Sequence, residues 1–167
     1  SKNQVIRVDT GSGESTPLSW VDPNSFTFLG TVYAKDKNSV WYANSYGGLQ
    51  KLESADAASF FAINPKVLDD NYHVGYGKDK NLVFRRDTKI PGADPDSFVA
   101  DISNDQWYNY FSKDKNHVYY LYGNDATASL DPATFEVITD GSQKDCGSGP
   151  YIKDANGIYT FDYNSVA

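Results

Sequence analysis

The chain has 167 residues, of which 40% are hydrophobic and 15% aromatic, enough for one domain of ordinary size with its own core. Its net charge of −7 and pI near 4.6 argue against partners that need a basic patch, such as nucleic acid or an anionic membrane surface. No apolar run approaches the roughly 18 residues of a membrane span. Met is absent, so we expect Ser1 to be the start of a processed or trimmed product.

A short phrase returns along the chain at intervals of tens of residues. The clear copies read Lys-Asp-Lys-Asn-x-Val followed by an aromatic residue, and they occupy residues 35–42, 78–84 and 113–120. A weaker copy occupies residues 153–159, and residues 2–6 hold a copy without its beginning. Successive copies lie 35 to 43 residues apart, measured from Asn to Asn. Self-similarity at such a period predicts a repeat architecture.

Each copy places a short polar segment between two runs of β-forming residues, which predicts a β-hairpin. We expect Asp-Lys-Asn to form a type I turn that Asn closes in the left-handed region, because Asn tolerates positive φ. The second and third residues after Asn are apolar in every copy. Since neighbouring strand residues point to opposite faces, both faces of each hairpin should be covered near the turn.

A second signature, Asp-x-x-Ser/Thr-Phe, lies between successive hairpins. It occupies residues 22–26, 56–60, 94–98 and 131–135, with Pro in the second position of three copies. Asp as N-cap and Pro at the first helical position predict the start of a helix. Because strand-like residues follow the Phe, we expect a single helical turn. The Phe should be a buried anchor.

These signatures predict a mainly β fold of tandem hairpin repeats of about 35–43 residues with one-turn helices. The units would form a compact repeat array or a small propeller-like closed form, with the compact or closed form favoured. We expect a single repeat domain over residues 1–167. Its predicted parts are a partial unit 1–28, units 29–70, 71–106 and 107–140, and a partial unit 141–167.

The phrase Lys-Asp-Lys-Asn-x-Val-Tyr-Tyr, with an aromatic residue before it and Asp-Pro-x-Ser/Thr-Phe after it, resembles the DKNYY repeat family. The match is closest at residues 111–120 and next closest at 33–42. It weakens where Phe84-Arg85 replaces the paired Tyr and where Ala155 replaces Lys. The resemblance implies a bacterial protein, often extracytoplasmic, without an established biochemical activity. It supplies no catalytic or ligand residues.

Candidate catalytic and metal-binding residues are few. His117 occupies the variable position after the turn Asn and is expected to be a solvated flank, while His73 is expected to have a structural or surface role. A single Cys, Cys146, excludes an internal disulfide and a multi-Cys metal site. The Asp residues fall mostly in the turn and cap positions, which gives them a structural role. The sequence therefore predicts no catalytic residue, no metal site and no cofactor, and a non-enzyme is favoured.

The fourth residue after the turn Asn keeps no single chemistry, so we expect a half-exposed stripe there. In the three clear copies this position holds Tyr42, Arg85 and Tyr120. Tyr46 and Tyr122, just past the hairpins, extend the stripe. Tyr rings beside Arg make good platforms for a protein partner or a sugar ring. These five residues are the candidate binding residues.

The favoured interpretation is a non-enzymatic, extracytoplasmic bacterial repeat domain that mediates protein–protein interaction or surface assembly. The first alternative is a glycan or cell-wall binding module that uses surface Tyr and Trp. The second is an acid/base hydrolase with paired Asp. The expected partner is a protein or a cell-surface assembly, with a glycan as the alternative. Neither a nucleic-acid partner nor a membrane span is expected.

Overall fold

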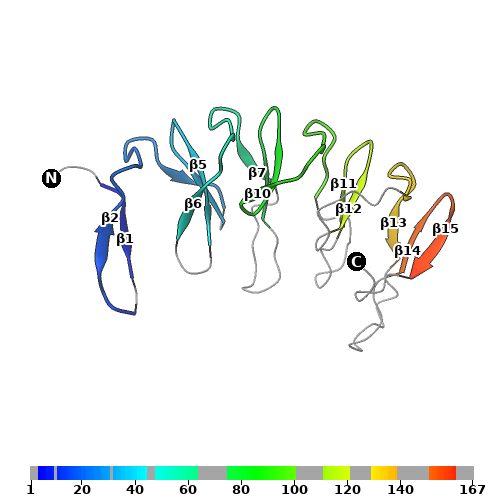
Figure 1. Ribbon diagram of the computed structural model, residues 1–167, viewed down its shortest axis with the longest axis horizontal. Helices are drawn as coiled ribbons and strands as arrows, with labels where there is room; N and C mark the ends of the chain where they lie inside the picture. Colours follow the sequence, from blue (N-terminus) through cyan, green and yellow to red (C-terminus); the bar gives the residue numbers. More distant parts are fainter. Residues whose placement is uncertain are drawn as a thin grey trace. The chain divides into compact units, whose positions relative to one another are not determined.

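The computed structural model describes residues 4–9, 11–30, 32–44, 48–63, 75–100, 111–120, 129–138 and 151–160 (Figure 1). These residues form fifteen short strands, all in small antiparallel sheets, and none of them is helical. The predicted mainly β fold of hairpin repeats is confirmed. Every pairing between the described strands joins neighbours in the sequence, so they form no closed barrel.

The chain divides into two compact units. The first comprises Ser1–Asp69 and His73–Lys89, and the second comprises Asp70–Tyr72 and Ile90–Ala167. The division between Lys89 and Ile90 falls inside the predicted repeat 71–106, after its hairpin and before its Asp-x-x-Ser-Phe segment.

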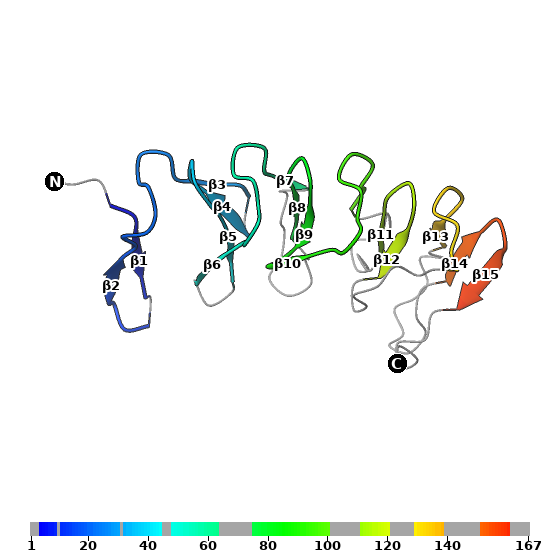
Figure 2. The ribbon, with the colours of Figure 1, turned by 45° about the horizontal axis from the view of Figure 1, so that its top comes forward.

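The first unit contains three sheets, each built around one hairpin. The first sheet pairs β1 (Ile6–Val8) with β2 (Ser15–Pro17). The second has the order β3 (Thr27–Phe28), β4 (Tyr33–Lys35), β5 (Val40–Ala43), β6 (Leu49–Lys51). The third has the same construction, with β7 (Phe61–Ile63), β8 (Tyr76–Lys78), β9 (Val83–Arg85) and β10 (Thr88–Lys89). Figure 2 shows the four strands of each larger sheet together.

The second unit repeats the hairpin twice. One sheet pairs β11 (Phe111–Lys113) with β12 (Val118–Tyr120), and an isolated bridge joins Val99 to Lys113. The other has the order β13 (Glu136–Ile138), β14 (Tyr151–Asp154), β15 (Gly157–Thr160). The register is the same as in the first unit, because Phe111 lies opposite Tyr120 just as Tyr33 lies opposite Tyr42.

The four Asp-x-x-Ser/Thr-Phe segments form hydrogen-bonded turns, so the predicted one-turn helices are wrong. We call these segments the Phe turns. The backbone N–H of Ser25 donates to the carbonyl of Asp22 at 3.3 Å, and Thr134 donates to Asp131 at the same distance. The chain enters a strand directly after Phe26, Phe60 and Phe135, so the turn does not continue into a helix. The predicted capping by Asp is confirmed, as in the bond from the N–H of Asn24 to Asp22 Oδ1 at 3.0 Å.

The hairpin turns are closed by Asp, and the predicted left-handed Asn is wrong. Apart from Gly, the described residues with positive φ are Ser54 and Arg86, neither of which lies in these turns. In the first complete hairpin Asp36 Oδ1 accepts the backbone N–H groups of Asn38 and Ser39 at 2.7 and 2.8 Å. Because the carboxylate satisfies both donors, Asn does not need the left-handed conformation.

The hairpin β4–β5 has two faces that are covered by different segments. The backward face of β4–β5 carries Ala34 and Trp41 and packs on the preceding Phe turn, with the Trp41 and Phe26 ring centroids 6.1 Å apart. The forward face carries Tyr33, Lys35 and Val40 and packs on the following Phe turn. The second and third residues after the turn Asn are buried on opposite faces in the hairpins β4–β5, β8–β9 and β11–β12. The prediction that both faces are covered is confirmed for these three.

Candidate functional site

The turn carboxylates also tie each hairpin to the Phe turn before it. The second oxygen of each carboxylate accepts the backbone N–H of the first Asp of that Phe turn, at 2.8 Å in all four copies. The four pairs are Asp22 N to Asp36 Oδ2, Asp56 N to Asp79 Oδ2, Asp94 N to Asp114 Oδ2, and Asp131 N to Asp154 Oδ2. One side chain therefore closes the turn and fastens the junction between two segments distant in sequence.

A Lys and a hydroxyl group complete this network. In the third copy Lys115 Nζ lies 2.6 Å from Asp94 Oδ2, and the backbone N–H of Lys115 donates to Ser97 Oγ at 3.1 Å. The ion pair recurs between Lys37 and Asp22 and between Lys80 and Asp56. In the last copy Ala155 replaces the Lys and cannot form the ion pair, but its N–H still donates to Thr134 Oγ1 at 2.8 Å.

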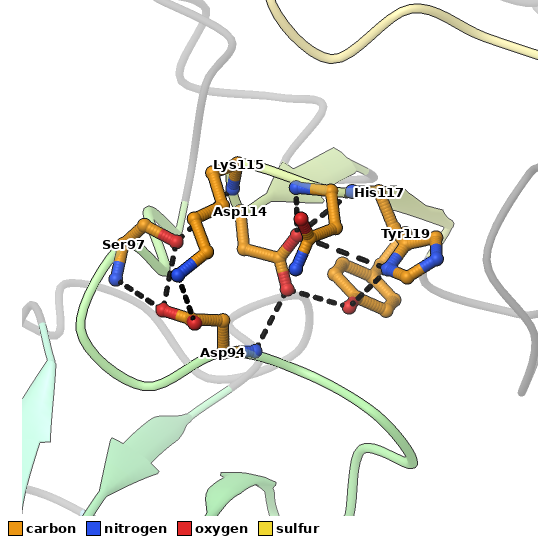
Figure 3. A network of polar contacts seen from close by, with 7 residues as sticks. Asp94, Ser97, Asp114, Lys115, His117 and Tyr119 are labelled. Atoms are coloured by element: carbon orange, nitrogen blue, oxygen red, sulfur yellow. Dashed lines mark hydrogen bonds and ion pairs between the residues drawn. The ribbon is translucent and has the colours of Figure 1, made fainter.

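The network around Asp114 brings several titratable side chains together at one hairpin tip (Figure 3). The hydroxyl of Tyr119 donates to Asp114 Oδ2 at 2.8 Å. The half-exposed ring of His117 lies against both, with Nδ1 3.4 Å from the Tyr119 hydroxyl and 3.9 Å from Asp114 Oδ1. An Asp, a His and a Tyr in contact are the residue types of acid–base chemistry, so their charge states decide what the group can do.

The pKa values of Asp94, Asp114 and Tyr119 are shifted away from neutral pH. Burial raises the pKa of Asp114, but hydrogen bonds from the N–H of Asp94, the Tyr119 hydroxyl and two backbone N–H groups of its own turn outweigh burial and leave it below its usual value. The hydrogen bond from Lys115, followed in size by those from Ser97, lowers the pKa of Asp94 to about 2. Burial, followed by the bond to Asp114, raises the pKa of Tyr119 well above its usual value.

These shifts favour a structural role for the network. A general acid or base works best when its pKa lies near the working pH. Here the two carboxylates stay ionised and the phenol stays neutral at pH 7. Both oxygens of Asp114 already accept hydrogen bonds from the protein. The group therefore acts as a fixed charge that holds the turn and the junction.

The predicted half-exposed stripe is confirmed at Tyr42 and Arg85, which are of intermediate exposure, but not at Tyr120. Tyr120 is only 3% exposed and belongs to a core cluster, so the expectation of a half-exposed ring is wrong there. Tyr42 and Arg85 are half-buried, and Tyr42 packs against a core cluster. The reason at Tyr120 is register, because this ring shares the forward face with Val118, and both belong to the core cluster that contains Phe135. Tyr46 and Tyr122 lie outside the described residues.

A different aromatic surface lies in the first unit. Trp20 is 52% exposed and Phe28 is 60% exposed, and they flank the half-buried Phe26 and the buried Trp41. Ring centroids are 5.4 Å apart for Trp20 and Trp41 and 5.2 Å apart for Phe26 and Phe28. We call these four residues the aromatic patch.

Comparison of the repeats could have found this patch in the sequence. Counted from the Asp of each Phe turn, the position of Trp20 holds a small residue in the other copies, namely Ser54, Gly92 and Ser129. The position of Phe28 holds Ala62, Ala100 and Val137. Large aromatic residues at positions that are otherwise small or aliphatic are the signal that the pattern analysis missed.

The family model described as the DKNYY family matches residues 10–163. The chain belongs to the DKNYY family. No curated protein and no solved structure matches the chain. The resemblance based on the Lys-Asp-Lys-Asn phrase is confirmed. The recurrent network gives that phrase a physical meaning, because its Asp, Lys and backbone groups all bind the preceding Phe turn.

The described part of this DKNYY chain holds no group of three or more His, Cys, Asp or Glu residues placed to bind a metal ion. No helix among those residues has the length and apolar character to cross a membrane. His73 and Cys146, considered as candidates from the sequence, lie outside the described residues. The network and the aromatic patch are the two candidate functional sites. The network already serves to hold the fold.

Proposed function

We propose that the chain is a non-enzymatic repeat domain that acts outside the cytoplasm of a bacterium, where it binds a protein partner or forms part of a surface assembly. The aromatic patch is the observation that carries this proposal. The bacterial source and extracytoplasmic location follow from what the family resemblance implies. The role in binding follows from the exposure of Trp20 and Phe28.

The patch has the properties of a binding surface. Trp is among the residues that contribute most to protein interfaces, and aromatic residues in general are enriched there. The Trp20 ring packs against Trp41, which is itself buried in the hairpin β4–β5, and the Phe28 ring contacts Phe26 edge to face. Rings supported in this way lose little conformational freedom when a partner covers them. Covering them also removes apolar surface from water.

The network supports the non-enzymatic part of the proposal. Its carboxylates accept backbone and hydroxyl hydrogen bonds, and the shifted pKa values of Asp94, Asp114 and Tyr119 move away from neutral pH. The acid/base hydrolase considered from the sequence has no supporting observation in this arrangement, and we do not propose it.

A capture experiment on the envelope fraction of the source cell tests the proposal. The baits are the wild-type chain, a Trp20→Ser/Phe28→Ser variant and a matched control, Phe61→Ser, which removes an exposed Phe on β7 outside the patch. We expect one protein to be captured by the wild type and the control and lost with the double variant. Equal capture by all three baits, or no captured protein, would contradict the proposal.

A glycan is the second candidate ligand for the same patch. The specific observation in its favour is the exposed indole of Trp20, since a flat aromatic face suits a sugar ring. Retention of the wild type on isolated cell-wall polysaccharide, lost with Trp20→Ser/Phe28→Ser and accompanied by no captured protein, would replace the protein partner with a glycan.

A further inference from the structure

The forward face of the hairpin β4–β5 binds the Phe turn that follows it in the chain. The following Phe turn places Phe60 against Tyr33, with ring centroids 5.3 Å apart. Lys35 Nζ donates to the carbonyls of Ala57 and Phe60 at 3.0 and 2.9 Å. Tyr33 and Val40 are both 0% exposed as a result. The face thus consists of an aromatic residue, a Lys and a β-branched residue, and together they bind one Phe turn.

The forward face of β11–β12 in the second unit is built and covered in the same way. Phe135 lies 5.3 Å from Phe111, again between ring centroids. Lys113 Nζ donates to the carbonyls of Pro132 and Phe135 at 2.9 and 3.5 Å. Phe111 and Val118 are buried. Two independent examples therefore establish the same complementarity between a forward face and a Phe turn.

The forward face of β14–β15 has the same three kinds of residue but is much more exposed. Tyr151 is 40% exposed and Ile158 is 71% exposed, although the residues at their positions in β4–β5 are fully buried. Lys153 is half-exposed, and its Nζ lies 2.7 Å from the carboxylate of Glu136. On the backward face of this hairpin Ile152 is buried in the cluster that contains Phe135. The last hairpin is thus buried on one side only.

We propose that the forward face of β14–β15 is a docking site for a further Phe turn, presented by a protein partner built from the same repeat. The partner's Phe packs against the Tyr151 ring and covers Ile158, and two carbonyls of its turn accept hydrogen bonds from Lys153. This inference rests on the proposed protein-binding function and assigns it a second surface, separate from the aromatic patch.

The chemistry of the face favours this occupant. A Phe turn brings one aromatic ring and two carbonyl acceptors, which match an aromatic ring, an aliphatic side chain and one cation. The spacing of these groups along two paired strands is that of the two covered faces, since Tyr151 lies opposite Thr160 and Lys153 opposite Ile158. The exposed ion pair with Glu136 contributes little, so Lys153 can exchange it for the carbonyls at small cost.

A peptide titration of the full chain tests the docking site. The probe is a synthetic peptide with the sequence of residues 129–138, which includes the last Phe turn, and the matched control peptide carries the change Phe135→Ser. We expect amide NMR signals of Tyr151, Lys153 and Ile158 to shift saturably, with a dissociation constant on the order of 1 mM. The control peptide should bind about tenfold more weakly or worse, since it lacks the apolar ring.

Two variants of the full chain complete the test. Ile158→Glu, at a position exposed enough to leave folding intact, should weaken peptide binding about tenfold or more. Ile6→Glu, at an exposed apolar residue of the first unit, should leave binding unchanged. Absence of shifts at about 5 mM peptide, where a site of the expected strength is mostly filled, would overturn the docking site. Equal binding of the two peptides, or of Ile158→Glu and the wild type, would also overturn it.

Failure of this inference and failure of the proposed function give different results. If the peptide does not bind but the wild type still captures a protein through Trp20 and Phe28, the protein-binding function stands and the docking site falls. If the peptide binds and Ile158→Glu abolishes its binding while no protein is captured from the envelope, the docking site stands and the role of the aromatic patch falls.

Discussion

Replacing Asp114 by Asn tests whether one carboxylate holds both a hairpin turn and a junction. Asp114 is buried and accepts four hydrogen bonds. Asn keeps one oxygen, which can still accept the N–H groups of Asn116 and His117. Its amide nitrogen must then occupy the place of Oδ2, where it faces the backbone N–H of Asp94. Two donors would meet where a donor and an acceptor now lie 2.8 Å apart.

The expected cost follows from that single site. A hydrogen bond to a charged group contributes about 1.5–3 kcal/mol, and a buried donor left without a partner costs a similar amount. The bond with the Tyr119 hydroxyl can reverse direction, because the amide donates and the hydroxyl accepts. We therefore expect Asp114→Asn to lower the free energy of unfolding of the second unit by about 2–3 kcal/mol. Asp114→Ala, which loses all four bonds, should cost about 4 kcal/mol or more.

Urea unfolding followed by amide NMR signals measures this cost in each unit separately. Signals of Lys113 and Val118 report on the second unit, and the signal of Val40 in the first unit is an internal reference. The control is Asp96→Asn, the same chemical change at an exposed position of the Phe turn at residues 94–98, with an expected effect below about 0.5 kcal/mol. An unfolding free energy for Asp114→Asn equal to that of the control would refute the dual role of the carboxylate.

Three further predictions concern packing and charge. Ser112→Ala should raise the unfolding free energy by about 1 kcal/mol in urea titrations. The Ser112 Oγ is buried without a hydrogen-bond partner in the described structure, and Ala34 occupies the same position in β4. A loss of stability would show that the hydroxyl is bonded. Gly77→Ala should lower the unfolding free energy by about 2 kcal/mol, since a Cβ there would collide with the ring of Phe60. An unchanged urea midpoint would contradict that packing. Acid should destabilise the fold. The pKa of Asp94 falls from 3.8 to about 2 on folding, so its contribution is present above about pH 4 and is lost as the pH falls toward 2. Urea midpoints measured between pH 5 and about pH 2 should fall for the wild type and change less for Asp94→Asn.

Several features were predictable because they depend on residues close together in the sequence. Each hairpin rests on a polar tip between β-forming runs, and each Asp cap binds a backbone N–H two or three residues later, as Asp22 binds Asn24. Burial of Phe60, Phe98 and Phe135 also followed from their fixed place in the repeat, whereas Phe26 at the same place is only half-buried. The period itself identified the family that the comparison confirms.

The closing residue of the turn could not be assigned from local preference alone. Asn and Asp both suit such a turn, and the preference of Asn for positive φ pointed to the wrong one. Asp36 is held by its own turn and also by the N–H of Asp22, fourteen residues earlier. That second bond exists only when the hairpin packs on the Phe turn, so no pattern within the hairpin indicates it.

The alternation of side chains along each hairpin was determined by the sequence, because successive residues of a strand point to opposite faces whatever lies beyond them. Which faces meet water was decided by tertiary structure, since exposure depends on whether another segment packs there. Val40 and Ile158 occupy the same position in their hairpins, yet the first is fully buried and the second is mostly exposed. The difference lies in the neighbour, because Phe60 covers Val40 whereas Ile158 stays open to solvent.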